Sequence, residues 1–104
     1  MARLSSLASV ADTRAVLDRF GLSTKKSLGQ HFLINDGVVE RICNLAELSH
    51  TDRVVEVGPG IGTLTEALLK RSGEVVSIER DTDLIEVLEE TCAPFSDTFS
   101  LISA

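Results

Sequence analysis

The feature that most constrains the fold is a glycine-rich stretch at residues 54–65, Val-Val-Glu-Val-Gly-Pro-Gly-Ile-Gly-Thr-Leu-Thr. It has a β-branched run typical of a strand, then three alternating glycines, then residues that favour the start of a helix. Gly58, Gly60 and Gly62 carry no Cβ, so their backbone can approach a ligand closely and adopt positive φ at low steric cost. Open α/β sheets bind nucleotide-like ligands at such strand-to-helix turns. We therefore predict a ligand site here, with a tight turn that binds nothing as the alternative.

The surrounding residues predict an alternation of helices and strands. Helices are predicted at 9–20, from Asn35 or Asp36 to 48, from Thr63 to Gly73, and from Asp81 or Thr82 to Pro94, with strands at 53–57, 75–79 and 99–102. Thr63 and Glu66 have the spacing of a capping box at the start of the third helix. The β-α-β-α-β order predicts a parallel sheet with right-handed crossovers.

The length of 104 residues allows one domain at most. A parallel sheet needs both of its faces covered, and three strands would leave a long unpaired edge. We therefore expect the chain to be the N-terminal piece of a longer protein, with a coding frame that continues past Ala104.

Charge is distributed unevenly along the chain. The net charge is −6, but residues 1–35 hold five basic against two acidic residues, whereas residues 53–104 hold four against ten. Lys25, Lys26 and Arg19 are therefore candidates for contacts with nucleic-acid phosphates. A solvated basic surface without a partner is the alternative.

The lack of a long apolar run and the positions of the two cysteines narrow the class of protein. The sequence has no run of about 18 apolar residues, so no membrane span is predicted. Cys43 and Cys92 stand 49 positions apart in apolar helical contexts and have no partner at metal-ligand spacing. We interpret them as reduced structural thiols of a cytosolic protein.

Two residues near the glycine turn narrow the ligand. Glu79 ends the strand that follows, 21 residues after Gly58, where a carboxylate can accept both hydroxyls of a ribose. A dinucleotide fingerprint would require glycine or alanine at the position of Thr63. An adenosine that carries an amino-acid tail therefore fits better than a pyrophosphate. Glu56, just ahead of the turn, either is satisfied by nearby amides or helps to fix the turn or a ligand ammonium group.

A second motif, Lys-Lys-Ser-Leu-Gly-Gln-His-Phe-Leu-Ile-Asn at residues 25–35, precedes the second predicted helix. A metal-ligand role for His31 is disfavoured because no second ligand stands near it. A general-base role, or a loop packed by Phe32, remains open from the residues alone.

These stretches together resemble one family. Ser-Leu-Gly-Gln-His-Phe-Leu at 27–33, Glu-Val-Gly-Pro-Gly-Ile-Gly-Thr-Leu-Thr at 56–65 and Glu-Arg-Asp at 79–81 are similar to the small-subunit ribosomal RNA adenine dimethyltransferases. That family also contains macrolide-resistance methyltransferases and a mitochondrial transcription factor. The resemblance implies a Rossmann-like, S-adenosylmethionine-dependent methyltransferase fold, truncated here after about three parallel strands. Residues 1–21 would form a tail and helix, and residues 22–104 the N-terminal part of the cofactor-binding domain.

The resemblance also implies which residues bind. It implies contacts to S-adenosylmethionine from His31, Leu33, Gly58 and Gly60, and from Glu79 to the ribose hydroxyls. Lys25 and Lys26 would contact RNA. His31 stands where the family usually has asparagine, which puts any side-chain contact there in doubt. The family's catalytic Asn-Leu-Pro-Tyr type loop does not occur in the sequence, so no catalytic residue is assigned and we expect this chain alone to bind the cofactor weakly and to methylate nothing.

The function implied by the resemblance is the dimethylation of adenosines in small-subunit ribosomal RNA. We expect the full-length protein to act as a cytoplasmic monomer on the small ribosomal subunit, without a membrane. Two alternatives remain at this point: a non-catalytic nucleic-acid-binding relative, like the transcription-factor branch, and a fragment of a nicotinamide-dependent oxidoreductase.

Overall fold

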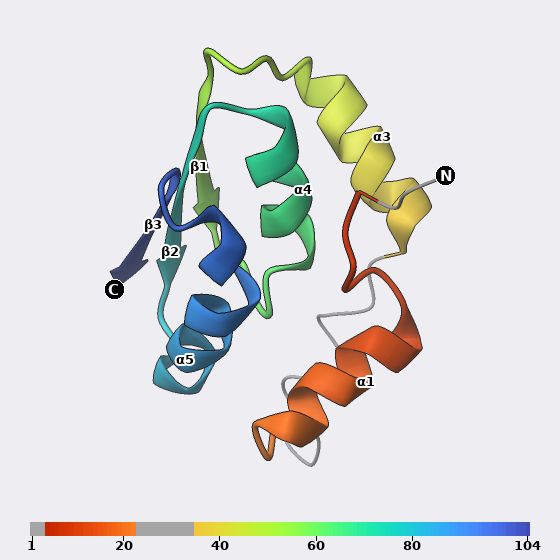
Figure 1. Ribbon diagram of the computed structural model, residues 1–104, viewed down its shortest axis with the longest axis vertical. Helices are drawn as coiled ribbons and strands as arrows, with labels where there is room; N and C mark the ends of the chain where they lie inside the picture. The colour runs from red at the N-terminus through yellow and green to blue at the C-terminus, as the bar shows by residue number, and fades with distance from the viewer. Residues whose placement is uncertain (1–3, 23–34) are drawn as a thin grey trace.

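The computed structural model describes residues 4–22 and 35–104 and has the predicted α/β architecture (Figure 1). Its elements are α1 (Val10–Arg19), α3 (Asp36–Ala46), β1 (Arg53–Val57), α4 (Thr63–Arg71), β2 (Glu74–Glu79), α5 (Thr82–Thr91), the short 3₁₀ helix η1 (Ala93–Phe95) and β3 (Phe99–Ser103). The strands lie in the order β1-β2-β3, and both neighbouring pairs are parallel. The predicted order of strands and helices is therefore confirmed.

Three helices begin where the sequence predicts, because each is preceded by a side chain that caps it. Ser9 accepts a hydrogen bond from the backbone N–H of Asp12, Asn35 from that of Val38, and Asp81 from that of Asp83, at 2.9–3.0 Å. All three capping residues have extended backbone, as this role requires.

Helix α4 begins differently, and the predicted capping box of Thr63 and Glu66 is wrong. The N-cap is Gly62, whose φ of 98° lies in the left-handed region and which has no side chain to cap with. The glycine turn delivers the chain into the helix one residue earlier than the pattern implies. Thr63 is therefore already inside the helix, and Glu66 makes its hydrogen bonds to Ser6 instead.

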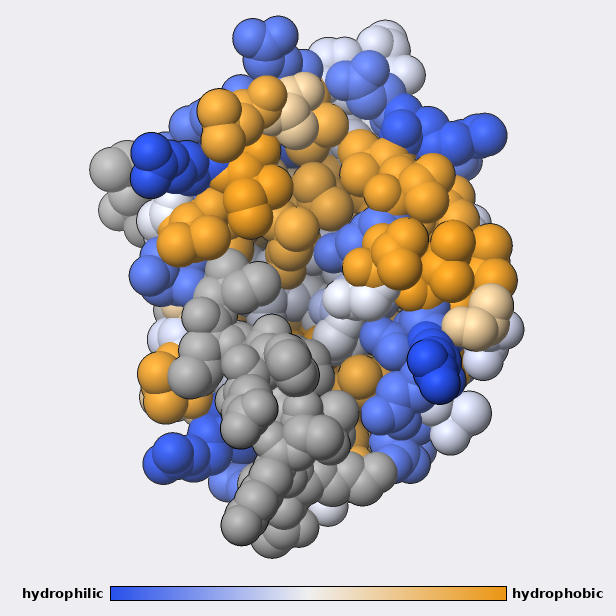
Figure 2. Space-filling view, turned by 180° about the vertical axis from the view of Figure 1, so that it is seen from behind, coloured by the Kyte–Doolittle hydropathy of each residue, from blue (hydrophilic) through white to orange (hydrophobic). Residues whose placement is uncertain are grey.

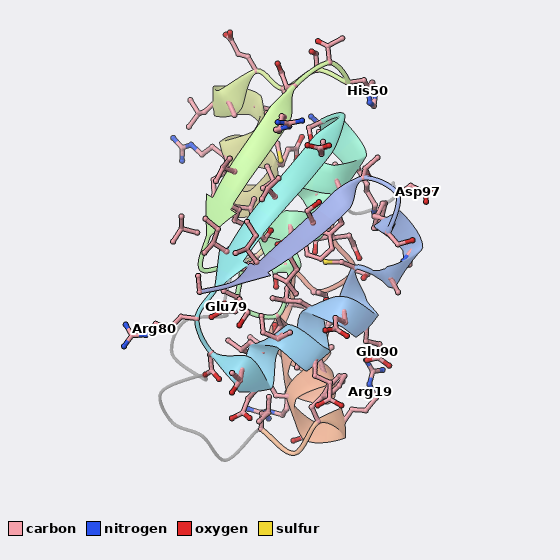
Figure 3. All side chains as sticks on the ribbon, turned by 90° about the vertical axis from the view of Figure 1, so that its left-hand side faces the viewer. Arg19, His50, Glu79, Arg80, Glu90 and Asp97 are labelled. Atoms are coloured by element: carbon pink, nitrogen blue, oxygen red, sulfur yellow. The ribbon has the colours of Figure 1, made fainter. Side chains whose placement is uncertain are left out.

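One face of the sheet is packed against helices and the other is not. On β2 the inward-facing Val75, Ser77 and Glu79 are buried. On the opposite face of the sheet, Val57 of β1 lies next to Ile78 of β2, and Ile78 lies next to Ile102 of β3. Val57 remains 79% exposed. Figure 3 shows this face of the sheet in front, with α3 and α4 behind it.

The buried side chains form two clusters. One joins α3, α4, α5 and the inner face of the sheet, and its fully buried members include Val39, Val75 and Leu88. The other joins α1 to α5 and to Ile61 of the glycine turn. The turn is thus part of a core and not a free surface loop.

Other large apolar side chains are exposed, and hydrophobic patches are visible from behind (Figure 2). On α3, Val38, Ile42 and Leu45 are exposed whereas Val39 and Cys43 are buried, so the apolar side chains of this helix are only partly covered. Among residues 4–22 and 35–104, no helix is long and apolar enough to cross a bilayer.

Candidate functional site

The glycine turn leads from the carboxyl end of β1 into α4. Its three glycines have φ values of 71° at Gly58, 63° at Gly60 and 98° at Gly62, all in the left-handed region that favours glycine. The N–H of Gly58 donates to the carbonyl oxygen of Ile78 at 2.9 Å, which fixes the start of the turn to β2. A Cβ at Gly58 would meet no atom within 4 Å, and the residue is exposed. The backbone here is therefore open to a ligand.

Gly62 has a different role at the other end of the turn. A Cβ there would lie 2.9 Å from Oγ1 of Thr91 and 3.4 Å from Sγ of Cys92. Thr91 also donates a hydrogen bond from Oγ1 to the carbonyl oxygen of Ile61 at 2.9 Å. The Gly62 end of the turn is thus packed against α5, which leaves the Gly58 end as the ligand-facing side.

The carboxylate of Glu79 ties the turn to the start of α5. It is 6% exposed, and its Oε1 accepts from the N–H of Gly60 at 3.3 Å. Its Oε2 accepts from the N–H groups of Arg80 and Asp81, each at 2.9 Å. Carboxylate oxygens have further lone pairs, so capacity for ribose hydroxyls remains. Figure 3 shows Glu79 at the end of the sheet, with Arg80 projecting away from it.

Glu56 lies on the inner face of β1, between the sheet and α4. Its Oε1 accepts from Oγ1 of Thr65 at 2.5 Å and from Oγ of Ser77 at 2.9 Å. Burial raises the pKa of Glu56, the two hydroxyl groups oppose that rise, and the nearby charge of Glu79 adds to it. Of the two predicted roles, the structure supports a satisfied strand-end carboxylate, although hydroxyl groups and not amides satisfy it.

Among the residues that the structure describes, Thr63 has the one buried side-chain polar atom without a hydrogen-bond partner. It is 3% exposed, and its Oγ1 makes no hydrogen bond in the part of the chain described here. An unsatisfied buried hydroxyl costs about 1–3 kcal/mol. Native proteins keep such groups rarely, and often where a ligand or water supplies the missing partner.

These features fit the group that the family resemblance implies. The open backbone at Gly58 accommodates an amino-acid tail, Glu79 offers acceptors for ribose, and Thr63 offers an unused hydroxyl. S-Adenosylmethionine combines an adenosine with such a tail. In residues 4–22 and 35–104, no group of histidine, cysteine, aspartate and glutamate side chains is arranged to hold a metal ion.

The structure brings three of the predicted site residues together: Gly58, Gly60 and Glu79 meet where β1 and β2 end. The predicted His31, Leu33, Lys25 and Lys26 lie outside the described residues.

Arg19 was a candidate for a phosphate contact, but the structure gives it another partner. Its Nη2 lies 2.5 Å from Oε2 of Glu90, and the two side chains point toward one another in Figure 3. Its guanidinium group also lies 5.6 Å from the centroid of the Phe20 ring.

Sequence reasoning missed the hydroxyl groups that hold the site, those of Thr65, Ser77 and Thr91. One signal for Ser77 was present, because it stands two residues from both Val75 and Glu79 and so shares their face of the strand. The partners of Thr65 and Thr91 depend on the packing of α4 and α5, which no local pattern reveals.

Comparison with known proteins agrees with this geometry. The family profile described as "Ribosomal RNA adenine dimethylase" matches residues 21–99. A ribosomal RNA small subunit methyltransferase A of Pediococcus pentosaceus is 51% identical over 85 residues, which cover 82% of this chain and 29% of the relative. The protein of the same name from Staphylococcus haemolyticus is 45% identical over 91 residues, covering 88% and 31%. The chain thus spans about three tenths of the length of these curated relatives.

Two solved structures resemble the fold. A dimethyladenosine transferase from Plasmodium falciparum aligns with a TM-score of 0.62 at 27% identity, covering 67% of this chain and 26% of that one. The 23S rRNA methyltransferase ErmE aligns with a TM-score of 0.61 at 34% identity, covering 65% and 28%. Together with the profile match over residues 21–99, these similarities show that the chain belongs to the ribosomal RNA adenine dimethylase family.

Proposed function

We propose that the complete protein dimethylates adenosines of small-subunit ribosomal RNA, with S-adenosylmethionine as methyl donor, and that residues 22–104 are the N-terminal part of its cofactor-binding domain. The observation that carries the proposal is the junction of Gly58, Gly60 and Glu79 at the carboxyl ends of two parallel strands. The names of the relatives support the choice of RNA.

Each site residue has a distinct part in binding the donor. Glu79 accepts the ribose hydroxyls, and the backbone of the turn at Gly58 and Gly60, which is open at Gly58, receives the methionine part. The buried hydroxyl of Thr63, which has no partner, would bond a polar group of that part under this proposal. His31 and Leu33 contribute further contacts under this proposal. The bound donor supplies a methyl group on a positively charged sulfur.

The reaction makes particular demands on the protein. The exocyclic amine of adenosine is a poor nucleophile, because its lone pair is delocalised into the ring. Most of the rate must therefore come from positioning and electrostatics. The target base must also leave its stack to reach the donor. Lys25 and Lys26 would add sequence-independent contacts to RNA phosphates, with an affinity that falls as salt rises.

The same proposal makes the protein a cytoplasmic one, acting as a monomer on the small ribosomal subunit. The test uses the complete protein, as its gene encodes it, with small subunits that lack dimethyladenosine and with labelled S-adenosylmethionine. Digestion of the RNA to nucleosides and mass spectrometry should show dimethyladenosine. Cofactor binding without any methylated nucleoside would contradict the proposed activity and favour a non-catalytic relative.

A further inference from the structure

The family profile matches residues 21–99. The N-terminal segment, residues 4–22, lies ahead of this match except for its last two residues. It nevertheless shares a buried hydrophobic cluster with the glycine turn. Leu7, Val16, Leu17 and Leu22 are all buried and share one hydrophobic cluster with Ile61. Ile61 stands between Gly60 and Gly62 and is itself 0% exposed.

A polar contact joins the same segment to the helix that follows the turn. Glu66 on α4 is buried, and both of its carboxylate oxygens accept from Ser6: Oε2 from the backbone N–H at 2.5 Å and Oε1 from Oγ at 2.7 Å. Lys70 adds a contact at 3.5 Å. The N–H of Ser5 donates to Oδ1 of Asp36 at 3.3 Å, which ties the segment to α3 as well. In Figure 1 the start of the segment runs between α3 and α4 before it enters α1, which lies below them.

Ile61 is consequently held from two directions. Its carbonyl oxygen accepts from Thr91 on α5, while its side chain lies in the same hydrophobic cluster as Val16 and Leu17 of α1. On the outside, the ion pair of Arg19 with Glu90 also joins α1 to α5, but both side chains are more than half exposed, so it contributes little. The buried contacts at Ile61 and Glu66 are the ones that constrain the turn.

We propose that the N-terminal segment is a positioning element for the glycine turn, acting through Ile61 and Glu66. The turn contains three glycines in the left-handed region, so its backbone has wide freedom unless packing restricts it. Docking of the segment selects the conformation that the donor needs, and donor binding in return stabilises the docked segment. Such coupling is reciprocal by thermodynamic necessity. This inference rests on the proposed function only in that S-adenosylmethionine is taken to be the donor.

The test compares Ser6→Ala and Leu17→Ala with a matched control, Leu69→Ala, in the complete protein. Leu17 and Leu69 are both leucines, 5% and 6% exposed, but Leu69 belongs to the cluster that does not contain Ile61. Thermal melting first establishes that the two leucine variants lose similar stability. Calorimetry should then show an S-adenosylmethionine Kd raised at least about fivefold in Ser6→Ala and Leu17→Ala, the lower end of typical couplings, and little changed in Leu69→Ala.

A second readout needs no ligand. Hydrogen exchange of the backbone amides at residues 58–66 should be at least about fivefold faster in Ser6→Ala and Leu17→Ala than in Leu69→Ala, because native exchange reports local opening. Equal exchange and equal Kd in all three variants would overturn the inference. A wild-type protein that binds no S-adenosylmethionine would contradict the proposed function alone, and the exchange measurement would still decide this inference.

Discussion

Oε1 of Glu79 accepts a hydrogen bond from the backbone N–H of Gly60 at 3.3 Å, across 19 residues of sequence. The bond joins the end of β2 to the turn that follows β1. The carboxylate and the turn backbone that we propose to bind the donor are thereby held side by side.

Replacing Glu79 should weaken donor binding strongly. Glu79→Gln keeps the shape of the side chain but removes the charge, and an amide nitrogen cannot accept the bonds that a carboxylate oxygen accepts. We expect the Kd for S-adenosylmethionine to rise by about one to two orders of magnitude, since hydrogen bonds to charged groups contribute about 1.5–3 kcal/mol. Glu86→Gln on the exposed face of α5 is the control and should bind as the wild type does.

The two end glycines of the turn should respond differently to alanine. Gly58→Ala meets no neighbouring atom, so it should cost only the left-handed strain of about 1–2 kcal/mol, while the new methyl group obstructs the ligand. Gly62→Ala would add a collision with Oγ1 of Thr91, and overpacking of this kind costs a further 1–3 kcal/mol, roughly. Urea unfolding should therefore find Gly62→Ala the less stable variant. Equal unfolding free energies would argue against the packing described for α5.

The stability of the chain should depend on pH through Glu56. Burial raises the pKa of Glu56 in the folded state above the ordinary 4.5. At pH values between the unfolded-state pKa and the folded-state pKa, the folded protein therefore binds more protons than the unfolded one. Stability from this group is therefore lost as pH rises through that window. Glu56→Gln has no carboxyl group at this position and so escapes this loss. The unfolding free energy of the variant minus that of the wild type should therefore increase from pH 4 to pH 7, by about 1.4 kcal/mol for each unit by which the folded-state pKa exceeds the unfolded one. Glu89→Gln, at an exposed position of α5, is the control.

The two thiols should be inert in the folded protein. Cys43 and Cys92 are free and buried, and burial raises the pKa of Cys92 to about 11. Because the thiolate is the reactive form, alkylation of Cys92 at pH 8 should be slower than for an ordinary thiol by about 100-fold. Urea should release both thiols. Rapid modification of Cys92 in the native protein would show that its contact with the Gly62 end of the turn is open.

Much of the fold could be predicted because it depends on local chemistry. Runs of β-branched and apolar residues set the strands, and Asn35 and Asp81 cap two helices at positions where the sequence predicts a cap. The start of α4 was the exception. A threonine followed three residues later by glutamate matches a capping box, but the preceding left-handed Gly62 had already taken the N-cap position.

Part of the candidate site could be predicted because the order of strands alone determines which residues meet. Gly58, Gly60 and Glu79 lie at the ends of neighbouring parallel strands, where topology alone brings them together. The contacts of Ser6 with Glu66 join residues 60 positions apart. No periodicity or spacing in the sequence encodes such a contact, since it follows from how α1 packs on α5 and on the turn.

The central claim is that the turn at Gly58 and the carboxylate of Glu79 form a methyl-donor site. Its most direct test is a pair of calorimetric titrations of the complete protein, one with S-adenosylmethionine and one with NAD. The account predicts saturable, one-to-one binding of S-adenosylmethionine that is weakened in Glu79→Gln, with no binding of NAD. Binding of NAD that depends on Glu79, or binding of S-adenosylmethionine that ignores this substitution, would contradict it.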